Sequence, residues 1–191
     1  MKTATYILTI DERKDRRAAA ESQMAALGID ATVWIAHKEA LPAWSNFQSH
    51  RNMVKDAVAL DCDRVAIFED DFVLREGFKP LMDACFASLP PYWHMLLLGA
   101  CLHEPPEWFS QHLYRVNNHT MMHAYELSRA GMQVFLEHAA RLDAIGHCHS
   151  WDAWMGAQEM NRFLTRPILA IQSDGQSDIT DRWTRYEGEK F

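Results

Sequence analysis

One stretch of the chain, residues 64–74, limits the possible folds more than any other. An apolar run leads there into three consecutive carboxylates, Glu69, Asp70 and Asp71, and apolar residues resume directly after them. A run of this length, rich in β-branched and aromatic residues, is typical of a buried strand in a parallel sheet. Ligands of open α/β sheets bind beyond the carboxyl ends of such strands. The sequence therefore places an acidic cluster where a hard cation and a phosphate-bearing substrate would be held.

The acidic triplet has a second interpretation that the sequence leaves open. Adjacent carboxylates repel one another unless some are protonated, solvated or neutralised by a cation. A solvated turn that caps the next helix would satisfy them as well as a metal site would. The surrounding pattern has to decide between the two.

Alternating strand and helix patterns surround this run. Apolar runs predict strands and helical periodicity between them predicts helices, so that successive strands pair in parallel through right-handed crossovers. In the first half we expect a helix that Asp11 caps and Gly28 ends, strands over 5–10, 31–36 and 93–98, helices over 46–60 and 76–88, and a loop over 37–44. In the second half we expect a loop over 102–112, strands over 113–116, 119–127 and 164–171, and helices over 128–140 and 150–161.

These elements predict a single α/β domain over residues 1–191, with a mostly parallel central sheet flanked by helices and an irregular C-terminal half. The last twenty residues are polar, and we expect them to fold over the site. A mobile tail is the alternative.

Composition excludes several classes of function. Nineteen basic and 26 acidic residues give a net charge of −7, which argues against a general nucleic-acid or membrane-surface binder. No apolar run approaches the roughly 20 residues of a membrane span. The N-terminus lacks the apolar core of a signal peptide, and the four cysteines show no metal-binding spacing, which favours buried, reduced thiols in a cytoplasmic protein.

The order of these features resembles glycosyltransferase family 25, the lipopolysaccharide and collagen-type galactosyl- and glucosyltransferases. The blocks that carry the resemblance are Leu8–Arg16, Ile35-Ala36, Ser49-His50, Phe68–Asp71, Leu97–Gly99, Thr120–Ser128, and Gln172 with Ser177–Ile179. Thr9 stands where the family usually has Asn, and Phe47-Gln48 stand where Gly-Cys commonly precedes Ser-His. The chain is also short for the family, which makes the acceptor the least transferable part.

The resemblance implies a GT-A fold and a metal-dependent, inverting transfer of a hexose from UDP-galactose or UDP-glucose to a saccharide hydroxyl of a surface glycan such as lipopolysaccharide. Residues 1–100 would form the nucleotide-sugar half and residues 101–191 the acceptor half. A hydroxylated protein side chain or a hydroxymethylated base of viral DNA is an alternative acceptor, although the net charge disfavours DNA. A non-catalytic nucleotide-sugar-binding module is a third interpretation.

The same resemblance implies roles for residues on the donor side. Asp71, with Glu69, would hold Mn²⁺ or Mg²⁺, because these ions prefer oxygen ligands and phosphates complete their shell. The nucleotide sugar would be bound by Thr9, Asp11, Arg13, Arg16, Ala36, His50, Glu69, Asp70, Ser177 and Asp178. The alternative is that Asp11 only caps a helix and that the arginines are solvated surface.

On the acceptor side, Asp152 is the candidate general base of an inverting transfer. Ser150 would cap a helix and leave Asp152 ionised in its first turn. Trp151 and Trp154 share a helix face and would stack on a sugar ring. A helix-stabilising Asp and two core tryptophans are the structural alternatives.

Overall fold

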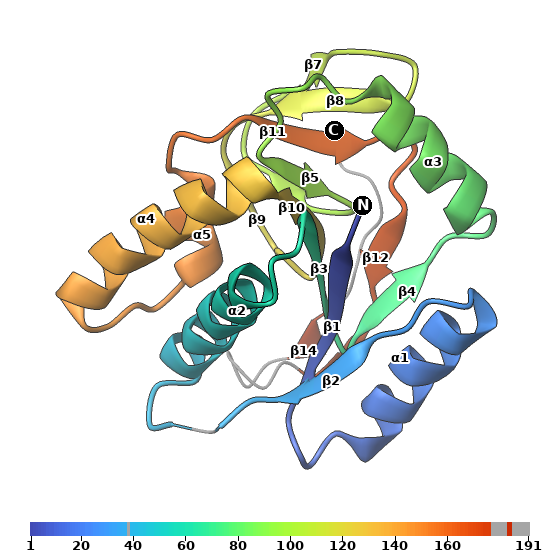
Figure 1. Ribbon diagram of the computed structural model, residues 1–191. Helices are drawn as coiled ribbons and strands as arrows, with labels where there is room; N and C mark the ends of the chain where they lie inside the picture. The colour runs from blue at the N-terminus through green and yellow to red at the C-terminus, as the bar shows by residue number, and fades with distance from the viewer. Residues whose placement is uncertain (38, 177–182, 185–191) are drawn as a thin grey trace.

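The computed structural model describes residues 1–37, 39–176 and 183–184. Its centre is an eight-stranded sheet (Figure 1), in the order β2 (Thr32–Ile35), β1 (Thr3–Thr9), β3 (Arg64–Glu69), β10 (Ala124–Ser128), β5 (Met95–Leu97), β11 (Arg162–Thr165), β8 (Leu113–Val116) and β7 (Glu107–Trp108). The pairings make β10 and β8 antiparallel to the other six strands. The predicted α/β class with a mostly parallel sheet is therefore confirmed.

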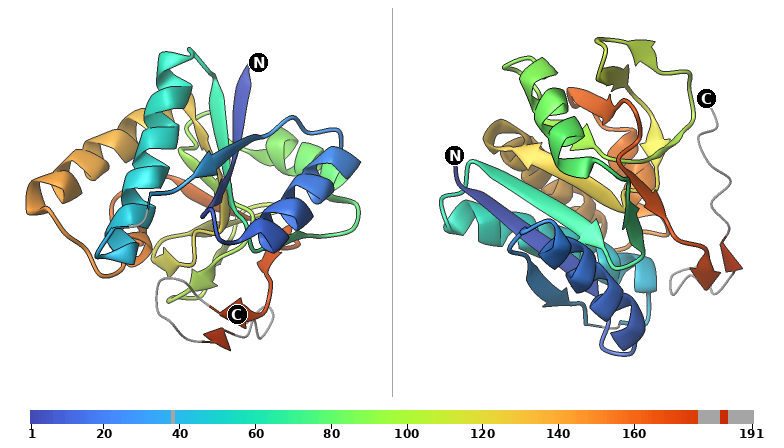
Figure 2. Two further views of the ribbon diagram at one scale, coloured as in Figure 1. Left: turned by 90° about the horizontal axis from the view of Figure 1, so that it is seen from below. Right: turned by 90° about the vertical axis from the view of Figure 1, so that its right-hand side faces the viewer.

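Helices cover both faces of this sheet. On one face lie α2 (Pro42–Ala59), α4 (Arg129–Ile145) and α5 (Trp151–Gly156), and on the other α1 (Lys14–Ala26) and α3 (Phe78–Ser88). The right-hand view of Figure 2 shows α1 and α3 in front of the sheet and α2 and α4 behind it. No helix in the described part of the chain is both long and apolar enough for a membrane span.

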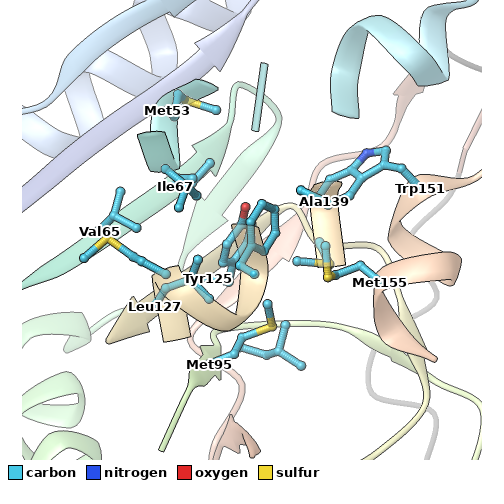
Figure 3. Packing of buried hydrophobic residues seen from close by; sticks show 14 of the residues in the cluster. Met53, Val65, Ile67, Met95, Tyr125, Leu127, Ala139, Trp151 and Met155 are labelled. Carbon is cyan, nitrogen blue, oxygen red and sulfur yellow. The ribbon is translucent and has the colours of Figure 1, made fainter. Parts of the chain in front are cut away.

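The alternation of side chains along β3 explains the two layers of core. Val65 and Ile67 pack against α2, α4 and α5, whereas Ala66 and Phe68 belong to the cluster under α1 and α3. Successive side chains of a strand point to opposite faces, so a strand buried on both sides is apolar at every position. Figure 3 shows the first cluster, with Tyr125 of β10 at its centre.

Among the described residues, three short strand pairs lie outside the main sheet, and these pairings were not predicted. They are β4 (Phe72–Leu74) with β12 (Ala170–Gln172), β6 (Cys101–Leu102) with β9 (His119–Thr120), and β13 (Gly175–Gln176) with β14 (Trp183–Thr184). The predicted strand 119–127 is interrupted because Met121 has a left-handed φ of 62°. The predicted strand 164–171 is broken after Thr165, and Pro167, which lacks an N–H donor, follows the break.

Several helix boundaries also differ from the prediction. The second helix begins at Pro42, inside the expected loop, because proline is favoured in the first turn where no N–H partner is needed. Asp11 does not cap α1: the N-cap position is Arg13. Helix α5 ends at Gly156, short of the predicted 161, whereas α4 continues to Ile145 and stops at Gly146 with a left-handed φ. The cysteines are unpaired, and only Cys101 is exposed.

Candidate functional site

A pocket of about 290 Å³ lies at the carboxyl ends of β1 and β3. Glu69 is the last residue of β3, and the next two residues form the turn that leads into β4. The predicted donor-side residues that line this pocket are Thr9, Arg16, Ala36, Glu69, Asp70 and Asp71. The structure therefore brings together residues that are up to 62 positions apart in the chain, as the parallel pairing of β1 with β3 requires.

The two aspartates are held from three directions. Thr9 donates its hydroxyl to Asp70 at 2.5 Å, and Gln172 of β12 donates its side-chain amide to Asp71 at 2.7 Å. The guanidinium of Arg16, on α1, lies 3.8 Å from Asp70 Oδ1 and 3.5 Å from Asp71 Oδ2. These contacts hold both carboxylates at the pocket wall.

The contacts do not fully offset the cost of burying the negative charges. Burial raises the pKa of Asp70 to about 6 despite its hydrogen bond from Thr9. Burial, followed by the charge of Glu69, also raises the pKa of Asp71 above its ordinary value. Oδ1 of Asp71 is buried and has no hydrogen-bond partner among the described residues. A carboxylate oxygen in this condition favours an additional cation in the pocket.

The family resemblance implies a divalent metal ion. The side chains of this pocket fit such an ion in only one way. Within the described ranges, no three His, Cys, Asp or Glu side chains form a ready metal cluster. Mg²⁺ and Mn²⁺ bound with a diphosphate need only one or two protein carboxylates, because phosphate and water oxygens complete the shell. The unpartnered oxygen of Asp71 fits that mode, with Glu69 as the second carboxylate at the pocket wall.

Glu69 is oriented by a network of hydrogen bonds from α2. Its Oε1 accepts from Asn46 Nδ2 at 2.9 Å and lies 3.2 Å from Nε2 of His50. The other ring nitrogen of His50 lies 2.9 Å from the hydroxyl of Tyr125, and Trp151 Nε1 donates to Asn46 Oδ1 at 3.0 Å. His50 is completely buried, so it acts behind Glu69 and does not line the pocket.

Asn46 and Gln172 line the pocket but were absent from the predicted site. Asn46 precedes His50 by four residues, and this spacing on a helix already placed the two side chains on one face. Gln172 carried a signal only as part of the family resemblance. Its bond to Asp71 depends on the pairing of β12 with β4, which joins residues about 100 positions apart.

Not every predicted donor-side residue reaches the pocket. Asp11 is largely exposed, lies 3.8 Å from the guanidinium of Arg17, and is not part of the pocket lining. Arg13 occupies the N-cap position of α1 and does not line the pocket either. Ser177 and Asp178, together with most of the tail expected to cover the site, lie outside the described residues.

The acceptor-side residues are placed differently from the prediction. Trp151 is only 3% exposed and packs between Phe47, His50 and Phe135, so it is a core residue and not a stacking platform. Trp154 is partly buried against the same cluster. A tryptophan can stack on a sugar only if one face of its ring is exposed, and the buried ring of Trp151 has no exposed face.

Asp152 is engaged in local structure. Its Oδ2 accepts from the Met121 backbone N–H at 2.8 Å, and its Oδ1 accepts from the Ser150 hydroxyl at 2.7 Å. The Ser150 side chain therefore does not cap the helix as predicted. The bond from Met121 ties α5 to the segment between β9 and β10, and Asp152 is outside the pocket lining. Its catalytic role stays a prediction.

Comparisons with known proteins agree with this description. Residues 40–121, which contain His50 and the acidic triplet, match the family model "Glycosyltransferase family 25 (LPS biosynthesis protein)". No curated protein sequence matches the chain.

Among solved structures, a glycosyltransferase involved in the glycosylation of the major capsid of PBCV-1 is 11% identical with a TM-score of 0.49. The alignment covers 73% of this chain and 66% of that one. Mannose-1-phosphate geranyltransferase from Thermus thermophilus is 10% identical with a TM-score of 0.53, covering 86% of this chain and 74% of that one. At these identities the likeness concerns the fold alone. Residues 40–121 are therefore similar to glycosyltransferase family 25, and the likeness to the geranyltransferase shows a shared fold.

Proposed function

We propose that the protein transfers a hexose from a nucleotide sugar, UDP-galactose or UDP-glucose, to a saccharide hydroxyl of a surface glycan. The observation that carries this proposal is the buried Oδ1 of Asp71, which has no hydrogen-bond partner among the described residues, in a pocket that also contains Glu69, Asp70 and Arg16. Three acidic side chains beside one guanidinium suit a ligand that brings both negative phosphates and a positive ion. The match to family 25 supports the same chemistry.

The residues of the pocket would divide this work by charge. Asp71 and Glu69 would hold a divalent cation, which when bound supplies Lewis-acid stabilisation of the departing diphosphate. Arg16 offers a planar, permanently charged donor group for phosphate oxygens. Its ion pairs with Asp70 and Asp71 hold the guanidinium beside the two carboxylates, which supports a role for Arg16 in binding the diphosphate.

The residues that contact Glu69 from α2 would keep its side chain in one orientation during the reaction. Asn46 and His50 both contact the same oxygen, Oε1, which leaves Oε2 without any bond to these two residues. A preorganised carboxylate loses less free energy on ligand binding than one that must first be ordered. The general base on the acceptor side remains Asp152, as a prediction.

Slow release of UDP from UDP-sugars by hydrolysis, without an acceptor, tests this function. We expect the protein to release UDP in the presence of Mn²⁺, and the Asp71→Asn variant to lose that release. Asp83→Asn, an exposed position on α3, is the matched control and is expected to keep it. A panel of glycans, hydroxylated proteins and hydroxymethylated DNA then identifies the acceptor.

The result that would overturn the proposal is equally specific. If UDP binds without metal, and Asp71→Asn binds it as tightly as the parent protein, the site is a nucleotide-binding module without transferase chemistry. Binding is measured by calorimetry with and without Mn²⁺, so that loss of hydrolysis is not confused with loss of folding.

A further inference from the structure

Arg162, the first residue of β11, is a buried cation. The residue is only 2% exposed, and its Nη2 donates to the carbonyl of Met155 at 2.6 Å. Its Nε is buried and has no hydrogen-bond partner in the described part of the chain. A guanidinium carries five N–H donors, so one carbonyl leaves most of its hydrogen-bonding capacity unused.

No carboxylate neutralises this charge among the described residues. Arg162 takes part in none of the ion pairs that the described residues form. Burial alone lowers the pKa of Arg162 to about 10. The carbonyl of Met155, in the last turn of α5, contributes only a partial negative charge. Buried charges in folded proteins are ordinarily paired, so the missing partner needs an explanation.

An open pocket of about 450 Å³ lies beside Arg162. It is also lined by His94, Asn117 and Asn161, and by two successive residues, Glu159 and Met160. His94 Nδ1 accepts the backbone N–H of Asn161 at 3.1 Å, so the proton of a neutral ring is on Nε2, which is a donor. Arg162 and His94 therefore both present donors. Among the described residues that line this pocket, Glu159 is the only one with a carboxylate, and it is exposed.

This pocket is separate from the carboxylate site. Arg162 of β11 lies opposite Met95 of β5, which follows His94 in the chain. Across β10, Met95 lies at the same level of the sheet as Val65 of β3. Val65 precedes Glu69 by four residues on β3, so the pocket lies towards the amino end of that strand. No residue lines both pockets.

We propose that this pocket binds a phosphate-type oxyanion, with Arg162 as its principal ligand and His94 as a second donor. A tetrahedral oxyanion would supply the negative charge that no described residue brings to Arg162. The phosphate arrives either as the free ion or as the phosphoryl group of a sugar phosphate. This inference does not depend on the transferase activity.

The direct test follows the guanidinium resonances of Arg162 by ¹⁵N NMR while inorganic phosphate, and separately glucose 6-phosphate, is added at constant ionic strength. We expect a saturable shift with at least one of them, and the tighter ligand identifies the source. Unchanged Arg162 resonances at saturating concentrations of both would overturn the proposal. This measurement uses the unaltered protein, so it does not depend on a variant that folds.

Two variants add an independent readout. Arg162→Gln is expected to weaken phosphate binding at least about tenfold, the effect of losing one charge-assisted hydrogen bond. Arg115→Gln is the control, because Arg115 is exposed and pairs with Phe163, whose side chain points to the opposite face from Arg162. Glu159→Gln is expected to tighten binding by removing a repelling charge. If Glu159→Gln instead abolishes it, or Arg162→Gln binds unchanged, the proposal fails.

Discussion

Oε1 of Glu69 lies 3.2 Å from Nε2 of His50, and the imidazole of His50 is completely buried between Tyr125 and Trp151. The carboxylate of Glu69, the last residue of β3, is thus fixed by the core of the protein and not by solvent. Side chains that orient a functional group in this way commonly matter as much as the group itself. The hydrogen bond from Asn46 to the same oxygen makes this dependence testable.

If Glu69 holds the proposed metal ion, Asn46→Ala is expected to lower the rate of UDP release about tenfold or more, since supporting partners of metal ligands contribute about that much to activity. The variant loses the donor to Glu69 and the acceptor for Trp151 Nε1. Turnover and thermal unfolding are measured together. Asn52→Ala, on the same helix but outside the pocket lining, is the control. A loss of stability with unchanged turnover would show that Asn46 only supports the fold.

Glu126 predicts how stability depends on pH. Burial raises its pKa from 4.5 to about 7 although Arg64 lies 3.5 Å away. The folded state holds the proton of Glu126 more tightly than the unfolded state does. Protonation of Glu126 therefore stabilises the folded state in full below pH 4.5, and this contribution is lost as the pH rises to about 7. This difference in pKa between the folded and unfolded states corresponds to about 3 kcal/mol.

Glu126→Gln is therefore expected to remove that loss. Its free energy of unfolding, measured by denaturant titration between pH 4 and 8, should fall by about 3 kcal/mol less than that of the parent protein. Glu137→Gln, at an exposed position of α4, makes the same chemical change as a control. Parallel pH profiles for the parent and Glu126→Gln would show that Glu126 does not keep its proton in the folded state.

Gly99→Ala is expected to destabilise the protein and to displace β12. A Cβ at Gly99 would lie 2.1 Å from the carbonyl oxygen of Ala170 and 2.9 Å from Nε2 of His123. Overpacking costs about 1–3 kcal/mol or more, and here a backbone atom must move. Gly28→Ala, where φ is +63° and the space is open, tests backbone strain alone. The free energy of unfolding should fall further for Gly99→Ala, and an equal or smaller loss would contradict the contact.

Asp152→Asn separates the structural and catalytic roles of this carboxylate. If Asp152 is the general base, transfer to an acceptor is abolished while affinity for the nucleotide stays nearly unchanged. The structure adds a cost of about 1–3 kcal/mol in stability, because the single oxygen of an amide cannot replace the two oxygens that accept from Met121 N–H and the Ser150 hydroxyl. Equal losses of transfer and nucleotide affinity would identify Asp152 as structural.

The features that could be predicted from sequence are those set by local pattern. The apolar run before Glu69 predicted a strand buried on both faces, and β3 is such a strand. The acidic triplet at its end lines the pocket, as the rule for carboxyl ends of parallel strands requires. Boundaries were less predictable, as the start of α2 at Pro42 shows, because a proline ends or begins a helix according to its neighbours.

Contacts between distant segments could not be predicted. Nothing in the sequence around Trp151 distinguishes a ring that stacks on a sugar from one that fills the core, because both need a helix with an apolar face. The docking of α5 against α2 buries Trp151 and turns its indole N–H toward Asn46. Likewise, Arg162 resembles an ordinary strand-end cation until the carbonyl of Met155 and the adjoining pocket are placed beside it.

The sequence by itself determined the α/β class, the strand that ends at Glu69 and the chemical character of the site, because these depend on periodicity and on neighbours along the chain. The tertiary structure alone decided which groups complete the site. Gln172 donates a hydrogen bond to Asp71, Asn46 and His50 contact Glu69, and Trp151 is buried in the core. The physical reason is that hydrogen bonding and desolvation act over a few ångströms in space. Residues about 100 positions apart come within that distance only after the sheet and its helices have packed.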